Sequence, residues 1–253
     1  IPVDYLAGTS MGGLIAAGYA TGMTAAQLEA AALAMRTRHL LDLTLSSMGL
    51  LEGKRLRQLL VRMFGDKEFA DTRIPLCLVA VDLNTGEELT LSEGSLVDAL
   101  RATVSVPGIF CPAAWRGRLL VDGGVTNNVP ADVVRAMGAE VVIAVDVGNP
   151  QFVPLAEEAA SRRIILPGLA RLSPLFGAMI RSVTIMQAEI LRHRLAQARP
   201  DLVIRPGIGP VNIEEFERAA EVIPTGQQAA ELALPRIRQL LRKRLFWGPW
   251  GRG

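Results

Sequence analysis

The sequence has few of the residues and patterns that mark several large classes of protein. Only two of its 253 residues are cysteines, so no disulfide framework is predicted and a reducing compartment is the default. The net charge of +2 is too weak to indicate a nucleic-acid partner. No apolar run is long enough for a membrane-spanning helix, and no signal peptide is visible. Aromatic residues make up 5% of the chain and hydrophobic residues 50%, so we expect a large core of aliphatic side chains.

The first fourteen residues combine a strand-like run with a glycine-rich turn. Residues 1–7 are mostly apolar and predict a buried strand, and a helix-forming stretch begins at Leu14. Between them, residues 8–12 (GTSMG) match the pattern Gly-x-Ser-x-Gly. A serine at a sharp turn between a strand and a helix is the arrangement of a nucleophile elbow. Ser10 is therefore the candidate nucleophile.

The neighbours of Ser10 fit the same geometry. We expect glycine at Gly8 and Gly12 because a Cβ at either position would crowd the close approach of strand and helix. The helix that starts at this turn points its first amides toward the serine, and the backbone N–H of Met11 is a candidate donor to an oxyanion.

Strand-like and helical segments alternate along the rest of the chain. This order predicts an α/β fold with a mostly parallel sheet and helices on both faces. The expected helices cover residues 11–20, 25–35, 52–64, 95–103, 173–199 and 212–246, the last one broken near Pro224 and Pro235. The expected strands cover residues 76–83 and 88–91 as a hairpin, and residues 119–121, 140–147 and 202–205. Residues 40–51 are expected to form a packed connector rather than a mobile lid, and residues 150–174 an excursion over the surface.

A nucleophilic serine needs a base, and histidine is scarce in this chain. His39 and His193 are the two candidates, and neither lies at the end of a strand or in a glycine-rich loop. Asp122 does stand at the end of a predicted strand, where open α/β sheets place their chemistry, and Gly123 and Gly124 follow it. The alternative for Asp122 is the Asp-Gly turn of a hairpin.

Three stretches of the sequence resemble the motif blocks of the patatin-like phospholipases, which use a Ser-Asp dyad. They are GTSMGG at residues 8–13, RATVSVPGIFCPA at 101–113 and DGGVTNNVP at 122–130. Bacterial members related to the neuropathy-target-esterase branch are the most similar. The resemblance covers residues 1–148 well and 199–240 loosely, and it implies a three-layer α/β/α sandwich formed by residues 1–253 as one hydrolase domain.

The resemblance also implies a reaction. Ser10 would be the nucleophile and Asp122 the base, with Gly123 and Gly124 in support, and the reaction would hydrolyse acyl esters of lipids through an acyl-enzyme. Phospholipids, lysophospholipids or other acyl-ester lipids are the expected substrates, and no metal or cofactor is expected. Because carboxylate is a weak base for a hydroxyl, apolar surroundings must raise the pKa of Asp122.

One departure from the family pattern leaves alternatives open. Members carry a first strand and a glycine-rich oxyanion loop upstream of the nucleophile strand, whereas this chain begins with Ile1 directly in that strand. We therefore expect little turnover from the chain as it stands, since losing one oxyanion donor typically costs about a hundredfold or more in rate. Two alternatives remain open. One is a catalytically impaired protein that binds a lipid or a partner, and the other is a conventional Ser-Asp-His esterase that uses His193.

The C-terminal segment has a composition of its own. Basic residues crowd residues 236–244, and Phe246, Trp247 and Trp250 follow in a Gly- and Pro-rich tail. A basic helix end followed by aromatic residues is typical of an interfacial anchor. We expect peripheral membrane binding through residues 242–252, and a location in the cytoplasm or at the inner face of the membrane. By contrast, the basic face of residues 52–64 is expected to be merely solvated.

Overall fold

The computed structural model describes residues 1–44, 48–148, 173–209, 211 and 215–247. Its helices are α1 (Ser10–Ala20), α2 (Ala25–Ala34), α3 (Lys54–Phe64), α4 (Leu96–Thr103), α5 (Ala131–Ala136), α7 (Ser173–Ala198) and α8 (Ala219–Trp247). Its strands are β1 (Leu6–Thr9), β2 (Gly49–Leu51), β3 (Leu76–Asp82), β4 (Glu88–Leu91), β5 (Gly108–Phe110), β6 (Ala113–Trp115), β7 (Arg118–Asp122), β8 (Ile143–Val145) and β9 (Leu202–Ile204). Short 3₁₀ turns include η1 (Thr37–His39) and η3 (Gly123–Val125).

Local signals in the sequence explain where several helices begin. Thr24 and Gln27 form a capping box at α2, in which each side chain accepts a hydrogen bond from the other residue's backbone N–H. The hydroxyl of Ser95 accepts the N–H of Asp98 at the start of α4. Gly22 follows α1 with a φ of 96°, a left-handed backbone that suits glycine.

Strand β3 is the centre of the main sheet, whose order is β1-β3-β7-β6 with β4 also paired to β3. β1 pairs with β3 in parallel, whereas β4 and β7 pair with β3 antiparallel and β6 pairs antiparallel with β7. Parallel pairs also join β2 to β5 and β8 to β9. The β3–β4 hairpin and the strand β7 agree with the sequence prediction. The antiparallel pairing of β7 with β3 and the short strands β2, β5 and β6 were not predicted.

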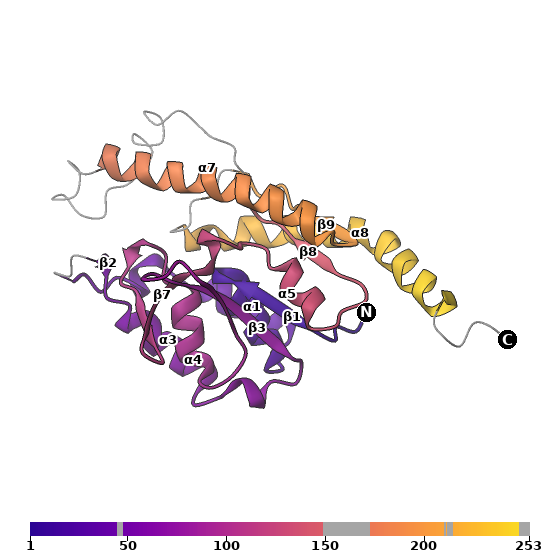
Figure 1. Ribbon diagram of the computed structural model, residues 1–253, viewed down its shortest axis with the longest axis horizontal. Coiled ribbons are helices and arrows are strands. Elements are labelled where there is room, and N and C mark those ends of the chain that lie inside the picture. Colours follow the sequence, from indigo (N-terminus) through magenta and orange to yellow (C-terminus); the bar gives the residue numbers. More distant parts are fainter. Residues whose placement is uncertain (45–47, 149–172, 210, 212–214, 248–253) are drawn as a thin grey trace.

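Helices cover both faces of the sheet, which confirms the expected α/β/α layers (Figure 1). All seven residues of β3 are buried, and their side chains alternate between the faces. Leu76, Leu78 and Ala80 belong to the large core that includes residues of α1, α3 and α4. Cys77 and Val79 pack on the other face against α5. The apolar run from Leu76 to Val81 is expected for a strand covered on both sides.

A second core lies between α5, α7 and the β8–β9 pair. It contains Ala131 of α5, Ala144 of β8, and Leu191 and Leu195 of α7, with Val203 of β9 packed against it. Figure 1 shows α7 on the side of the molecule opposite α3 and α4. This core holds α7 over the loop that follows β7, so it matters for the site described below.

Two predicted strands differ in the structure. The first is not a buried strand over residues 1–7: β1 begins at Leu6, and Ile1 and Val3 are 57% and 39% exposed. The second is shorter than residues 140–147, because β8 spans only Ile143–Val145 and both end residues are exposed. Apolar composition predicted burial in both places, but burial depends on whether another element covers the side chain.

The last helix also differs from the prediction. α8 runs continuously through Pro224 and Pro235, where the sequence predicted breaks.

Three predicted features lie wholly or partly outside the described residues. They are residues 45–47 of the predicted connector, most of residues 150–174, and the tail at 248–253. Within the described ranges, no helix combines the length and the apolar character that crossing a bilayer requires.

Candidate active site

Ser10 occupies a strained turn between β1 and α1, as the elbow pattern predicts. β1 ends at Thr9, α1 begins at Ser10, and the φ of Ser10 is 53°, in a region that non-glycine residues rarely adopt. A Cβ at Gly8 would lie 2.6 Å from both the carbonyl of Gly12 and the Cα of Gly13, so strand and helix touch through their backbones. The side chain of Ser10 is partly exposed. The turn therefore presents the serine at the surface of the sheet.

The neighbours of Ser10 agree with the prediction only in part. A Cβ at Gly12 would meet no atom within 4 Å, so the expectation that both flanking glycines prevent crowding is wrong for Gly12. The position that does need to be small is Gly13, where a Cβ would lie 2.9 Å from Leu78. The backbone N–H of Met11 has no acceptor among the described residues, and it stands at the start of a helix. That N–H can therefore donate to an anion beside Ser10.

Asp122 is brought next to Ser10 by the register of the sheet. β3 lies between β1 and β7, with Val79 opposite Thr9 and the next residue, Ala80, opposite Asp122. The two candidate residues therefore stand on either side of β3 at nearly the same level. The side chain of Ser10 lies close enough to the carboxylate of Asp122 to lower its pKa. The sequence predicted both residues, and the sheet brings them together.

The surroundings of Asp122 change its acidity. Burial raises its pKa from 3.8 to about 6, while the hydrogen bonds from Ser10 and from the backbone of Gly124 oppose this rise. The N–H of Gly124 donates to Oδ1 at 2.7 Å, and the residue is 5% exposed. The expected rise in pKa is thus present. A carboxylate with a pKa near 6 is a stronger base than an ordinary aspartate and is still ionised at neutral pH.

Thr103, at the end of α4, was not singled out from the sequence. Its hydroxyl accepts the backbone N–H of Ser10 at 3.0 Å and donates to the carbonyl of Val79 at 2.5 Å. The side chain is fully buried. It therefore fixes the strained turn to the central strand. Thr103 lies in the 101–113 block, but its contacts span the fold and leave no local signal.

Arg101 and Ser105 hold the loop after α4 against β7. The buried guanidinium of Arg101 donates to the hydroxyl of Ser105 at 2.6 Å and to the carbonyls of Glu52 and Cys111 at 2.8 and 2.9 Å. Burial lowers the pKa of this guanidinium. The carbonyl of Ser105 accepts the N–H of Asp122 at 3.0 Å. The position of Asp122 is therefore set by this loop as well as by β7.

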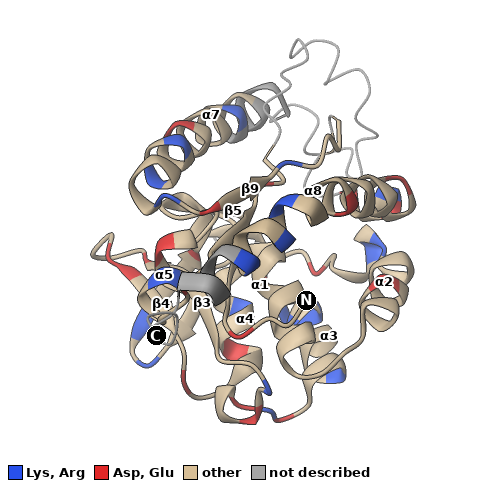
Figure 2. Ribbon diagram, turned by 90° about the vertical axis from the view of Figure 1, so that its right-hand side faces the viewer, with Lys and Arg blue, Asp and Glu red and all other residues tan. Residues whose placement is uncertain are grey.

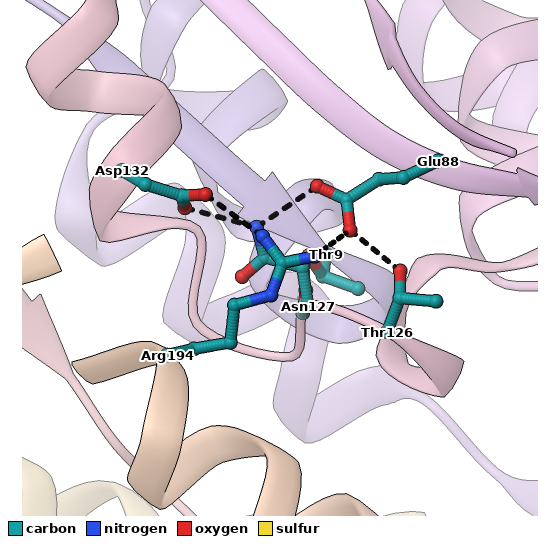
Figure 3. Close-up of polar contacts among 6 residues, drawn as sticks. All are labelled: Thr9, Glu88, Thr126, Asn127, Asp132 and Arg194. Atoms are coloured by element: carbon teal, nitrogen blue, oxygen red, sulfur yellow. Dashed lines mark hydrogen bonds and ion pairs between the residues drawn. The ribbon is translucent and has the colours of Figure 1, made fainter. Parts of the chain in front are cut away.

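A polar network ties β1 to the segment after Asp122 (Figure 3). The hydroxyl of Thr9 donates to the carbonyl of Asn127 at 2.7 Å. The side-chain amide of Asn127, which is 1% exposed, donates to Glu88 at 3.2 Å and to Asp132 at 2.9 Å. Arg194 of α7 pairs with both of these carboxylates. These contacts thus hold four elements together beside the site: β1, the β3–β4 hairpin, α5 and α7.

Glycine allows the segment after Asp122 to lie against β3. A Cβ at Gly123 would be 2.4 Å from the carbonyl oxygen of Val79, so only glycine fits there without a shift of the backbone. A Cβ at Gly124 would lie 3.1 Å from the carboxylate of Asp122 and 3.3 Å from the amide of Gln187 on α7. Both glycines therefore support the position of the carboxylate.

Neither histidine is the partner of Ser10. His39 lies in the exposed turn η1, and His193 is exposed on α7. The carboxylate whose pKa responds to the side chain of Ser10 is that of Asp122.

Comparison with known proteins decides the family. The family model described as patatin-like phospholipase matches residues 1–135, more than half of the chain. The chain belongs to the patatin-like phospholipase family. Ser10, Asp122 and the segment around Thr103 all fall inside this match, and the resemblance of the motif blocks is confirmed.

Several patatin-like relatives are similar over much of the chain. A patatin-like phospholipase domain-containing protein of Caenorhabditis elegans is 32% identical over 246 residues, which cover 89% of this chain and 18% of the relative. An uncharacterized NTE family protein of Mycobacterium tuberculosis is 30% identical over 254 residues, covering 96% of this chain and 43% of the relative. The human patatin-like phospholipase domain-containing protein 6 is 34% identical over 157 residues, covering 59% of this chain and 11% of the relative. The chain spans less than half the length of each of these patatin-like proteins.

Proposed function

We propose that this chain is a serine lipid acyl hydrolase in which Ser10 and Asp122 form the catalytic dyad. The observation that carries the proposal is the sheet register, which places Ser10 beside the buried carboxylate of Asp122, whose pKa is raised to about 6. Family membership supports the substrate class, since the matching family model is that of patatin-like phospholipases. Phospholipids and lysophospholipids are the substrates that we propose.

The proposed reaction proceeds through an acyl-enzyme. The oxygen of Ser10 attacks the ester carbonyl carbon while its proton passes to the carboxylate of Asp122. The tetrahedral intermediate collapses, the carbon–oxygen bond to the alcohol or lysolipid breaks, and Asp122 returns the proton to the leaving oxygen. Asp122 then takes a proton from water, whose oxygen attacks the acyl carbon; the bond to Ser10 breaks, Asp122 returns the proton to the serine oxygen, and the fatty acid leaves. The free N–H of Met11 would stabilise the negative oxygen in both steps.

The surface around Ser10 supports an apolar substrate. Met11 and Ile15 follow Ser10 on α1, and they are 45% and 43% exposed. They are four residues apart and so lie on one face of the helix. An acyl chain can contact this face while its ester lies at the serine. A cytoplasmic enzyme that attaches to the inner face of a membrane is part of the same proposal.

The test uses two readouts, because turnover depends on more groups than the nucleophile. A fluorophosphonate probe should phosphonylate Ser10 with loss of fluoride, and mass spectrometry should find the adduct on the peptide that contains it. Hydrolysis of lysophosphatidylcholine and of a p-nitrophenyl ester should be measured in parallel. Ser10→Ala should abolish labelling and hydrolysis together.

Variants of the two candidate bases separate the dyad from the alternatives. Asp122→Asn should remove hydrolysis, whereas His193→Ala should retain most of it because His193 is exposed. Loss of activity in His193→Ala with full activity in Asp122→Asn would contradict the dyad. A chain that folds and binds lipid but is never labelled at Ser10 would be a binding protein instead.

A further inference from the structure

An open hollow lies between η1 and α3, apart from Ser10 and Asp122. It has a volume of about 490 Å³ and is lined by Arg38, His39, Arg55, Gln58 and Arg62. All five residues are exposed. Arg55, Gln58 and Arg62 lie on one face of α3 because they are three and four residues apart. Arg38 and His39 reach the same hollow from η1, so the basic groups converge from two segments.

Ion pairs divide the basic residues of α3 into two sets. Lys54 pairs with Glu52 at 2.7 Å, and Arg57 pairs with Asp98 at 2.9 Å. Arg55 and Arg62, which face the hollow, have no side-chain hydrogen bond or ion pair with any described residue. The basic face of α3 is therefore partly ion-paired and partly unpaired. Figure 2 shows the basic residues of α3 in blue.

Two carboxylates near these segments have partners of their own, and the backbone N–H and hydroxyl of Thr37, the residue before Arg38, donate to Glu217 at 3.0 and 2.9 Å. Asp42 accepts the backbone N–H groups of Gly53 and Arg55 at 3.0 and 2.9 Å, so its oxygens cap the start of α3. The guanidinium of Arg38 also has no partner among the described residues. Three guanidinium groups therefore face one hollow without a bound carboxylate. A guanidinium presents its N–H groups as a planar fork that matches the oxygens of a phosphate.

We propose that this hollow binds the phosphate of a phospholipid headgroup and holds this face of the protein against an anionic bilayer. Headgroups of a bilayer can reach the hollow because every side chain that lines it is exposed. Two exposed apolar side chains lie close in the chain to these residues: Leu33 on α2, the helix before η1, and Val61, which precedes Arg62 on α3, at 38% and 41% exposure. Basic groups with apolar neighbours are the composition of a membrane-surface contact.

The proposal does not depend on hydrolysis, and the test keeps the two apart. All variants carry Ser10→Ala in addition, so that the vesicles stay intact. Binding is measured by co-sedimentation of the full chain with vesicles of phosphatidylcholine alone and of phosphatidylcholine mixed with phosphatidylglycerol. The pocket variant is Arg55→Gln with Arg62→Gln. The matched control is Lys54→Gln with Arg57→Gln, which removes the same charge from the same helix but outside the hollow.

The two double variants should behave differently. At about 1 kcal/mol for each basic group near an anionic surface, the pocket variant should bind the mixed vesicles about thirtyfold more weakly. The control should lose less than about threefold, and phosphatidylcholine alone should bind all forms weakly. Thermal unfolding of each variant verifies that the fold is intact. Equal losses in both variants would indicate general electrostatics, and no loss in the pocket variant would exclude the contact; either result overturns the proposal.

A second arm distinguishes a headgroup from free phosphate. Titration with inorganic phosphate and with glycerol phosphate, followed by calorimetry, measures whether a soluble anion occupies the hollow. One outcome would overturn the bilayer contact: soluble phosphate binds the unaltered pocket tightly, and the pocket variant still binds vesicles normally. The hollow would then be assigned to a free anion. Weak soluble binding together with the loss of vesicle binding in the pocket variant supports it.

Discussion

Asp122→Asn should have opposite effects on activity and on stability. Asparagine keeps the shape of the side chain and can still accept the N–H of Gly124 and donate to Ser10, but it cannot take a proton from the serine. Hydrolysis should therefore disappear. The variant also removes a carboxylate that is 5% exposed and has no described cationic partner, and this removal should stabilise the fold near neutral pH.

The size of the stabilisation follows from the pKa of Asp122. Because burial raises that pKa from 3.8 to about 6, the folded protein binds the proton more tightly than the unfolded chain. The free energy of unfolding of the wild type should therefore fall as the pH rises from about 4 to about 6, by about 3 kcal/mol for this group. Below this range the contribution is fully present, and above it the contribution is lost.

Urea unfolding at several pH values measures this difference. The free energy of unfolding of Asp122→Asn minus that of the wild type should increase by about 3 kcal/mol between pH 4 and pH 7. In the wild type, kcat/KM should rise with pH through about pH 6 and then level off, since the base must be ionised. A stability difference that does not change with pH, or a variant that keeps its activity, would refute the reasoning.

Three further predictions concern the support of the site and the chain end. Thr103→Val leaves the N–H of Ser10 without its acceptor, so the free energy of unfolding should fall by about 1–3 kcal/mol and hydrolysis should decrease, whereas an unchanged urea midpoint would contradict this role. Arg194→Gln removes the cation between two half-buried carboxylates and should cost about 1–3 kcal/mol in the same assay; equal stability would show that the pairs contribute nothing. A chain ending at Leu241 should bind anionic vesicles more weakly than residues 1–253, at about 1 kcal/mol for each basic group removed, and equal binding at low and high salt would exclude the tail as an anchor.

Short-range patterns predicted the elements that depend on neighbouring residues. The helix that begins after Thr24, the helix predicted over residues 95–103 and the hairpin after β3 all appear in the structure because their hydrogen bonds join residues a few positions apart. The elbow at Ser10 is of the same kind, since its strained φ comes from the change of strand to helix within one turn. Predictions based on composition were weaker: apolar side chains at Ile1 and Val145 proved exposed.

The sequence by itself determined the two candidate residues: a serine at a strand–turn–helix and an aspartate at the end of a strand, each recognisable from its immediate neighbours. Only the tertiary structure decided that they meet, because β3 separates β1 from β7 and sets their register. It also decided the pKa of Asp122, since desolvation depends on every atom packed around the carboxylate. The same holds for the arginines of α3: Arg57 pairs with Asp98, which is 41 residues away, whereas Arg55 and Arg62 remain open to an anion.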